Sequence, residues 1–91
     1  MIRSFQDTET EKIFWGIRNR KFQGVEKTAI RKPFQLHAAK SLHDLKSPGN
    51  QLEQLSGDRK GQHAIRINDQ YRLCFTWKEG DAYDVEITDY H

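Results

Sequence analysis

Apolar and polar residues alternate along the last third of the chain, which is the pattern of half-buried β-strands. The clearest run spans residues 71–78, and shorter runs span 63–67 and 83–88. The positions expected to face a core are Ile65, Ile67, Tyr71, Leu73, Phe75, Trp77, Tyr83, Val85 and Ile87. Residues 68–70 and 79–81 are short, polar connections of the kind that join neighbouring strands. This part of the sequence therefore predicts an antiparallel meander.

The first quarter of the chain begins with a candidate strand at 2–5 and then changes to helical spacing. Within the strand, Ile2 and Ser4 would face one way and Arg3 and Phe5 the other. Asp7 and Thr8 are N-cap candidates for a short helix that should end near Asn19. The apolar stripe of this helix would be Ile13, Phe14 and Ile17. Trp15 falls off the stripe, and we interpret it as a packing residue rather than a binding residue.

A longer helical pattern runs from residue 25 to residue 46, with Pro33 inside it. Proline lacks the amide donor and clashes with the preceding turn, so the helix either kinks at Pro33 or begins anew there. We favour a kinked helix pair packed on the sheet. The expected core face is Phe34, Leu36, Ala38, Ala39, Leu42 and Leu45. The expected outer face carries Lys27, Arg31, Lys32, Lys40 and Lys46.

A stop signal at 47–50 and two leucines, Leu52 and Leu55, suggest one more short strand before the meander. The order of elements is thus a strand, two helices and an antiparallel sheet. With 91 residues the chain is long enough for one small domain, and we expect residues 1–91 to form it. The predicted fold class is α+β, with the N-terminal strand and two helices packed on an antiparallel sheet and the helices on one face.

Charge is unevenly distributed along the chain, although the formal net charge is only +2. Residues 1–48 contain 10 Lys/Arg and 5 Asp/Glu, whereas residues 49–91 contain 5 and 8. A positive first half suits nucleic acid or an acidic partner, and a solvated helical surface explains the charge about equally well.

The remaining composition narrows the location and the chemistry. Cys74 is the only cysteine, so no internal disulfide can form, and a reducing compartment is favoured. No apolar run reaches the roughly 20 residues of a membrane span, and the first residues lack the apolar core of a signal peptide. We therefore expect a cytoplasmic protein. His37 and His43 are not at the i, i+4 spacing of a zinc pair, and we predict no metal or other cofactor.

Three stretches of the sequence together are similar to one known family. They are Leu52-Glu-Gln-Leu-Ser-Gly-Asp-Arg-Lys-Gly61, Ile65-Arg-Ile-Asn-Asp-Gln-Tyr-Arg-Leu-Cys-Phe75 and the final Asp89-Tyr-His91. With them the chain resembles the HigB branch of the RelE/ParE toxin superfamily over nearly its whole length. Each stretch alone is a weak signal, but the combination is specific.

The resemblance implies a RelE-like fold and a toxin of a type II toxin–antitoxin module. Such a toxin would cleave mRNA on the ribosome and thereby inhibit translation. Its partners would be a HigA-type helix-turn-helix antitoxin, the ribosome and mRNA, and it would contact operator DNA only through the antitoxin.

Five residues are expected to carry this chemistry. Metal-free RNA cleavage needs a base for the attacking 2′-hydroxyl, an acid for the leaving oxygen, and positive charge for the phosphorane. Arg72 is the first choice for charge stabilisation and Arg66 the second, since the two would converge across one hairpin if they share a face. His91 is the best acid–base candidate. Asp89 could orient it or act as the base, and Tyr90 could stack on a nucleobase or donate its proton.

Arg59, Lys60 and His63 complete the predicted site as RNA-binding residues. Glu53 and Ser56 occupy positions where some relatives carry a histidine and a lysine that assist the reaction. This departure keeps a second hypothesis open, in which the protein is a weakly active or non-catalytic homologue that binds the antitoxin and acts as a co-repressor. A third hypothesis, action on gyrase as elsewhere in the superfamily, fits the terminal Asp-Tyr-His and the strand arginines less well.

Overall fold

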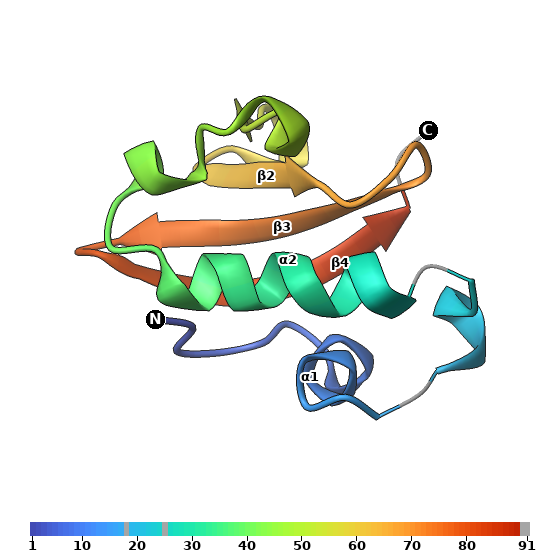
Figure 1. Ribbon diagram of the computed structural model, residues 1–91. Coiled ribbons are helices and arrows are strands. Elements are labelled where there is room, and N and C mark those ends of the chain that lie inside the picture. Colours follow the sequence, from blue (N-terminus) through green and yellow to red (C-terminus); the bar gives the residue numbers. More distant parts are fainter. Residues whose placement is uncertain (18, 25, 90–91) are drawn as a thin grey trace.

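The computed structural model describes the chain except for residues 18, 25, 90 and 91 (Figure 1). Its main elements are α1 (Thr8–Phe14), α2 (Glu26–Ala38), β1 (Glu53–Gln54), β2 (Gln62–Arg66), β3 (Tyr71–Lys78) and β4 (Asp81–Asp89). Single 3₁₀ turns lie at 20–22, 42–45, 48–50 and 57–59. The four strands form one sheet in the order β1-β2-β3-β4, and every neighbouring pair is antiparallel. The predicted α+β class and meander are confirmed.

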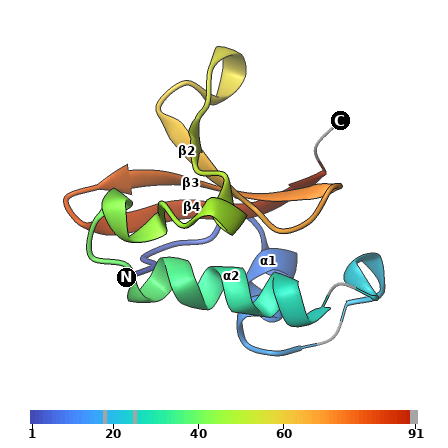
Figure 2. The ribbon, with the colours of Figure 1, turned by 45° about the horizontal axis from the view of Figure 1, so that its top comes forward.

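Both helices cover the same face of the sheet, and the loop that precedes β2 rises on the other face (Figure 2). The core lies between the helices and the sheet. Its fully buried side chains include Ile13, Phe22, Leu36, Leu45, Ile65, Leu73, Phe75 and Val85. The alternation along 65–75 therefore predicted the inward positions of β2 and β3 correctly, because both strands are regular there.

The N-terminal segment runs parallel to β4 and is held by two isolated bridges, Ile2 to Ala82 and Phe5 to Val85. The amide of Arg3 donates to the carbonyl of Ala82 at 2.8 Å, and the amide of Ile2 donates to Nδ1 of His37 at 3.1 Å. Ile2 and Phe5 both pack against the core. The predicted opposite orientation of these two side chains is wrong, because the segment is not a regular strand between its two bridges.

Helix α1 begins where the sequence predicted, since the Asp7 carboxylate accepts from the amide of Thr10 at 2.7 Å. It ends at Phe14, earlier than predicted, and Gly16 follows with φ +82°. Beyond that point helical spacing no longer applies. Ile17 and Trp15 are consequently exposed, so the predictions that Ile17 belongs to the buried stripe and that Trp15 packs are wrong.

Helix α2 continues through Pro33 and stops at Ala38, and the residues that follow form the 3₁₀ turn at 42–45. Pro33 is itself buried, so α2 faces the core with Ala29, Pro33 and Leu36. Phe34 is 52% exposed, and Ala38 is exposed as well. Leu36, Ala39 and Leu45 are buried as predicted, and Leu42 packs against the core, whereas the predicted burial of Phe34 and Ala38 was wrong. The predicted helical extent to residue 46 was also wrong, because α2 ends at Ala38.

The start of the 3₁₀ turn is capped by Asp44, which accepts from the amides of Lys40 and Ser41 at 2.9 and 3.2 Å. These hydrogen bonds, the one from Lys40 first, lower the pKa of Asp44. This cap stabilises a separate 3₁₀ turn at 42–45, so the chain does not continue as part of α2.

A β-bulge interrupts the pairing of β3 with β4. Cys74 is opposite Glu86 and Thr76 is opposite Tyr83, so two residues of β4 face the single residue Phe75. One of those two, Asp84, has φ +53°. The bulge turns Ala82 toward the core and Tyr83 toward the other face, and the predicted inward position of Tyr83 is wrong for this reason.

Candidate functional site

The face of the sheet that points away from α1 and α2, called the open face below, collects the polar strand residues. Two rows of paired residues cross it from β2 through β3 to β4. The first row is Arg66, Arg72 and Thr88, and the second is Ala64, Cys74 and Glu86, with Glu53 of β1 opposite Ala64. Alternation along each strand puts these side chains on one side, because the buried residues between them point the other way.

Arg66 and Arg72 are directly opposite each other on β2 and β3, so the predicted convergence across one hairpin is confirmed. Like charges at such positions destabilise a sheet. Each guanidinium is paired with a carboxylate. Arg66 forms an ion pair with Asp69, and Nε of Arg72 lies 3.7 Å from Oε1 of Glu53. Nη1 of Arg72 also donates to the carbonyl of Asn68 at 3.2 Å. The two guanidinium groups meet on the face that the helices leave uncovered, where the Arg72 side chain is 13% exposed, at a position that sheet stability alone does not favour.

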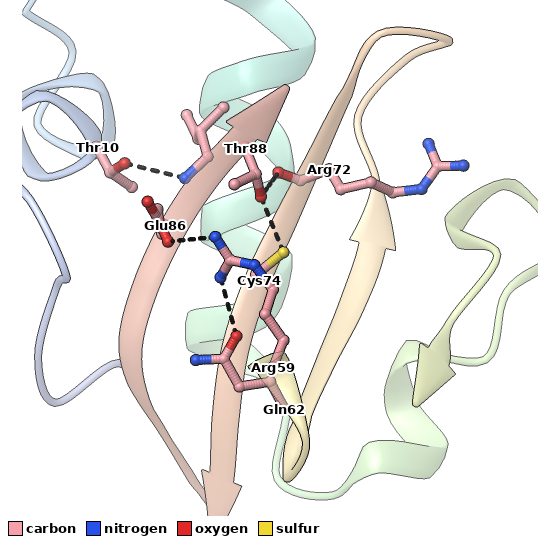
Figure 3. Close-up of polar contacts among 8 residues, drawn as sticks. Thr10, Arg59, Gln62, Arg72, Cys74, Glu86 and Thr88 are labelled. Carbon is pink, nitrogen blue, oxygen red and sulfur yellow. Dashed lines mark hydrogen bonds and ion pairs between the residues drawn. The ribbon is translucent and has the colours of Figure 1, made fainter. Parts of the chain in front are cut away.

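Arg59 reaches the same face from the 3₁₀ turn before β2 (Figure 3). Its guanidinium donates to Oε1 of Gln62 and to Oε1 of Glu86, each at 3.1 Å. The sequence predicted Arg59 as an RNA-binding loop residue, and the structure places it across the sheet, 27 residues from its carboxylate partner. Lys60, the next residue, is exposed at the rim.

Cys74 lies under this group of charges and is buried. Its sulfur is 2.9 Å from Oγ1 of Thr88. Burial raises the pKa of the Cys74 thiol, and the hydrogen bond between Cys74 and Thr88 and the charge of Arg59 oppose that rise without cancelling it. A protonated, buried thiol is a poor nucleophile, so Cys74 serves as a packing residue.

Two predicted residues are not brought to the open face. His63 pairs with Phe75 on the core side of β2, and the two rings stack at 6.2 Å. Asp89 pairs with Tyr71 and accepts from Nε2 of Gln70 at 3.2 Å, so strand alternation puts it on the side opposite Arg72. Tyr90 and His91 lie outside the described residues.

The sequence reading missed Lys32 and Glu86. Lys32 was assigned to the outer face of the helix but is buried, and Nζ donates to Oδ1 of Asn50 at 2.5 Å. The burial of Lys32 is indicated by its helical spacing from Ala29 and Leu36. This spacing is informative only if Pro33 is also treated as a core residue. Glu86 appeared as an ordinary outward residue, although it has the same strand parity as Thr88, the cross-strand partner of Arg72.

Within the described part of the chain, no group of three or more His, Cys, Asp or Glu side chains is arranged to hold a metal ion. Among the helices that the structure describes, none has the length and apolar character needed to cross a membrane. A shallow hollow of about 410 Å³ lies on the helical side of the molecule, not on the open face. Its lining residues are Gln35, Ala38, Ala39, Asp44 and Ser47.

Comparison with solved structures shows that the fold is shared with YoeB chains. The YoeB–YefM complex from Staphylococcus aureus contains a chain that matches with a TM-score of 0.63 at 18% identity, over 100% of this chain and 98% of that one. The YoeB dimer from the same organism matches with a TM-score of 0.59 at 21% identity, over 99% and 94%.

Sequence comparison is more specific. The family model described as the RelE-like toxin of type II toxin–antitoxin system HigB matches residues 3–91. Toxin HigB-1 of Vibrio cholerae is 36% identical over 90 residues, which cover 96% of this chain and 95% of that protein. Endoribonuclease HigB of Proteus vulgaris is 32% identical over 56 residues, 62% and 61% of the two chains. This chain therefore belongs to the HigB-like toxin family, and the resemblance found in its motifs is confirmed.

Proposed function

We propose that the protein is an endoribonuclease that cleaves mRNA on the ribosome and thereby arrests growth. Membership of the HigB-like family and the name of the Proteus vulgaris relative support the nuclease class. The observation that carries the proposal is the opposed pair Arg66 and Arg72, joined on the same face by Arg59. Three guanidinium groups on an accessible sheet face suit the phosphates of an RNA strand.

The proposed reaction is attack of a ribose 2′-oxygen on the adjacent phosphorus. The bond from phosphorus to the 5′-oxygen then breaks and leaves a cyclic phosphate. Arg72 is the main stabiliser of the phosphorane, because its guanidinium can hold two phosphate oxygens at once, and Arg66 assists from the opposite strand. Glu53 is the proposed base for the 2′-hydroxyl proton, since its carboxylate lies beside Arg72 on the same face.

The C-terminal residues keep the roles that the family resemblance implies. His91 is the proposed acid that protonates the leaving 5′-oxygen, and Tyr90 is proposed to stack on a base or assist that transfer. Asp89 is proposed to orient His91. Lys60 is proposed to contact RNA outside the reacting phosphate, and the predicted RNA contact of His63 is not retained because His63 lies on the core side of β2.

The partner that restrains this activity is proposed to be a HigA-type helix-turn-helix antitoxin that docks on α1 and α2. Trp15, Ile17 and Phe34 are exposed there, and the ring of Phe14 contacts those of Trp15 and Phe34 at 5.2 and 4.9 Å. The charged residues described as exposed between positions 8 and 38 are five Lys/Arg and two Glu, so an acidic segment with apolar side chains fits this surface. A second copy of the chain would bring positive charge against positive charge.

The complex would contact operator DNA through the antitoxin, and it would act in the cytoplasm, where ribosomes are. A solved structure of similar fold, the heterotetrameric YoeB–YefM toxin–antitoxin complex from Staphylococcus aureus, supports an antitoxin partner.

Mapping of mRNA 5′ ends in a purified translation system tests the nuclease. The wild-type protein should produce new ends within ribosome-bound codons, and none on naked RNA. Arg72→Ala should lower cleavage by about a hundredfold or more, as expected for loss of a charge-stabilising group. Lys78→Ala, an exposed cation at the end of the same strand, is the matched control and should cleave normally.

Two outcomes would contradict the proposal in different ways. Normal cleavage by Arg72→Ala would remove Arg72 from the site. A wild-type protein that binds the antitoxin tightly but produces no new ends would favour the alternative, a non-catalytic module that binds the antitoxin as a co-repressor.

A further inference from the structure

The centre of the open face has a floor of two small residues, Ala64 and Cys74. Both are buried, at 1% and 3% exposure, although neither faces the helices. Arg59 accounts for this, because its side chain extends over β3 from the turn before β2 and ends at β4 (Figure 3). A long arginine stem covers apolar surface in this way while its head stays polar.

Two acceptors on two different strands fix the orientation of the Arg59 guanidinium. Gln62 belongs to β2 and Glu86 to β4, and each oxygen is 3.1 Å from a different terminal nitrogen. A guanidinium carries five N–H donors, and these two contacts, within the described residues, use two of them. The remaining edge of a planar group held at two points is well suited to a second bidentate partner such as a phosphate.

The surroundings of the Arg59–Glu86 pair show that it lies in the same electrostatic site as Arg72. The charges of Arg59, Glu86 and Glu53 all act on the pKa of Cys74, which lies between them. Glu53 is also the carboxylate beside Arg72. An acidic residue at this place would repel RNA unless a cation neutralised it. A partly exposed ion pair contributes little to stability, so stability alone is a weak reason for the Arg59–Glu86 pair.

We infer that Glu86 is a positioning residue of the RNA-cleaving site, which holds Arg59 over the open face so that Arg59 grips the phosphate next to the one at Arg72. The inference rests on the proposed nuclease function and deepens it. Glu86 acts through Arg59 and does not itself touch the substrate.

Steady-state cleavage by Glu86→Gln is the first test. The variant keeps the shape of the side chain but loses its charge, and kcat should fall about ten- to a hundredfold with a smaller change in KM, because Arg59 is bound to the phosphate but misplaced. The double variant Arg59→Ala/Glu86→Gln should be no worse than Arg59→Ala alone. Asp84→Asn, an exposed carboxylate two residues earlier on β4, is the control. Unchanged or faster cleavage by Glu86→Gln would overturn the inference.

Exchange of the two charged residues, Arg59 and Glu86, distinguishes a positioning role of Glu86 from a role in stability alone. Arg59→Glu/Glu86→Arg should recover the melting temperature that either single change loses, while cleavage stays low, since the cation now starts from β4. Recovery of both stability and cleavage would show that the pair is only structural.

Alkylation of Cys74 gives a readout that does not depend on nuclease activity. Iodoacetamide should modify Cys74 faster in Glu86→Gln than in the wild type, because release of Arg59 uncovers the floor. An unchanged rate would overturn the inference even if no RNA cleavage could be measured for any protein. Conversely, faster alkylation in a chain whose wild type cuts no RNA would contradict the proposed function and leave the arrangement of Arg59 intact.

Discussion

Lys32 lies on the buried side of α2 and connects the helical layer with the segment that precedes β1. Its ammonium group donates to Asn50, and Nδ2 of Asn50 donates onward to the carbonyl of Leu45 at 3.2 Å. Burial lowers the pKa of Lys32, and the charges of Arg31 and Arg66 lower it further. A single side chain thus ties α2 to the loop that leads into the open face, and it does so at an electrostatic cost.

Replacement of Lys32 should show whether its hydrogen bond to Asn50 outweighs the cost of burying its charge. Lys32→Met leaves the buried Oδ1 of Asn50 without its donor, and we expect it to lower the free energy of unfolding at neutral pH by about 1–3 kcal/mol. Urea denaturation measures this change. Arg31→Met, on the exposed neighbouring position, should change stability by less than about 0.5 kcal/mol. A more stable Lys32→Met protein would show that the desolvated charge outweighs its hydrogen bond.

The pH dependence of the same pair of proteins has a definite sign. The pKa of Lys32 in the folded protein is below its ordinary value of 10.5. Between the lowered value and 10.5 the unfolded chain binds the proton more strongly, so this group makes the folded state more stable as pH rises through that range. The stability difference between wild type and Lys32→Met should therefore widen at alkaline pH, and a difference that narrows would contradict this assignment.

At the scale of elements, the β-bulge in β4 decides which side chains reach the open face. It needs Asp84 in the left-handed region, where φ is +53°. A β-branched residue is strained there, and we expect Asp84→Val to destabilise the fold by about 1–2 kcal/mol in urea denaturation. Asp84→Gly, which adopts this conformation freely, is the control and should be close to wild type. Equal stability of all three proteins would mean that the bulge is not under this constraint.

The same elements show how far the sequence alone could lead. Strict alternation in residues 65–75 determined β2 and β3, and with them the opposition of Arg66 and Arg72. Alternation could not locate the inserted residue in β4, because a bulge changes the register of hydrogen bonds and leaves no fixed mark in the pattern. In α2, Pro33 was expected to interrupt the helix, so its own burial and that of Lys32 were not predicted, although Leu36 and Ala39 were placed correctly.

The contacts of Arg59 were beyond sequence reasoning for a different reason. Its partners depend on how a turn folds over a finished sheet, and Glu86 is distant in sequence. A sequence motif is enough to propose Arg59 as a cation of the site. Its ion pair with Glu86 depends on the tertiary structure and cannot be predicted from the motif.

At the scale of the whole molecule, the proposed catalytic and antitoxin surfaces lie on opposite faces of the sheet. The arginines lie on the open face, whereas the exposed aromatic residues belong to the helical layer. Figure 2 shows that the two helices lie together on one face of the sheet. An antitoxin bound to the helices would then not need to fill the site. It could prevent entry into the ribosome simply by its size.

This separation predicts that the two functions can be removed independently. Phe34→Ser should weaken binding of the antitoxin about tenfold or more, as loss of an aromatic anchor does, and should leave cleavage unchanged. Arg72→Ala should abolish growth inhibition and leave antitoxin affinity unchanged. Calorimetric titration and a growth assay measure the two properties. Loss of both properties in either variant would contradict the separation.

The N-terminal segment has a consequence for how the chain folds. Its bridge from Ile2 to Ala82 closes a loop of 80 residues, and contacts so distant in sequence form late. Until then the outer edge of β4 offers unpaired backbone groups to any extended segment nearby. We expect concentrated refolding to give dimers in which two chains exchange residues 2–5, and dilute refolding to give monomers. The first few residues thus decide whether a chain completes its own sheet or that of its neighbour.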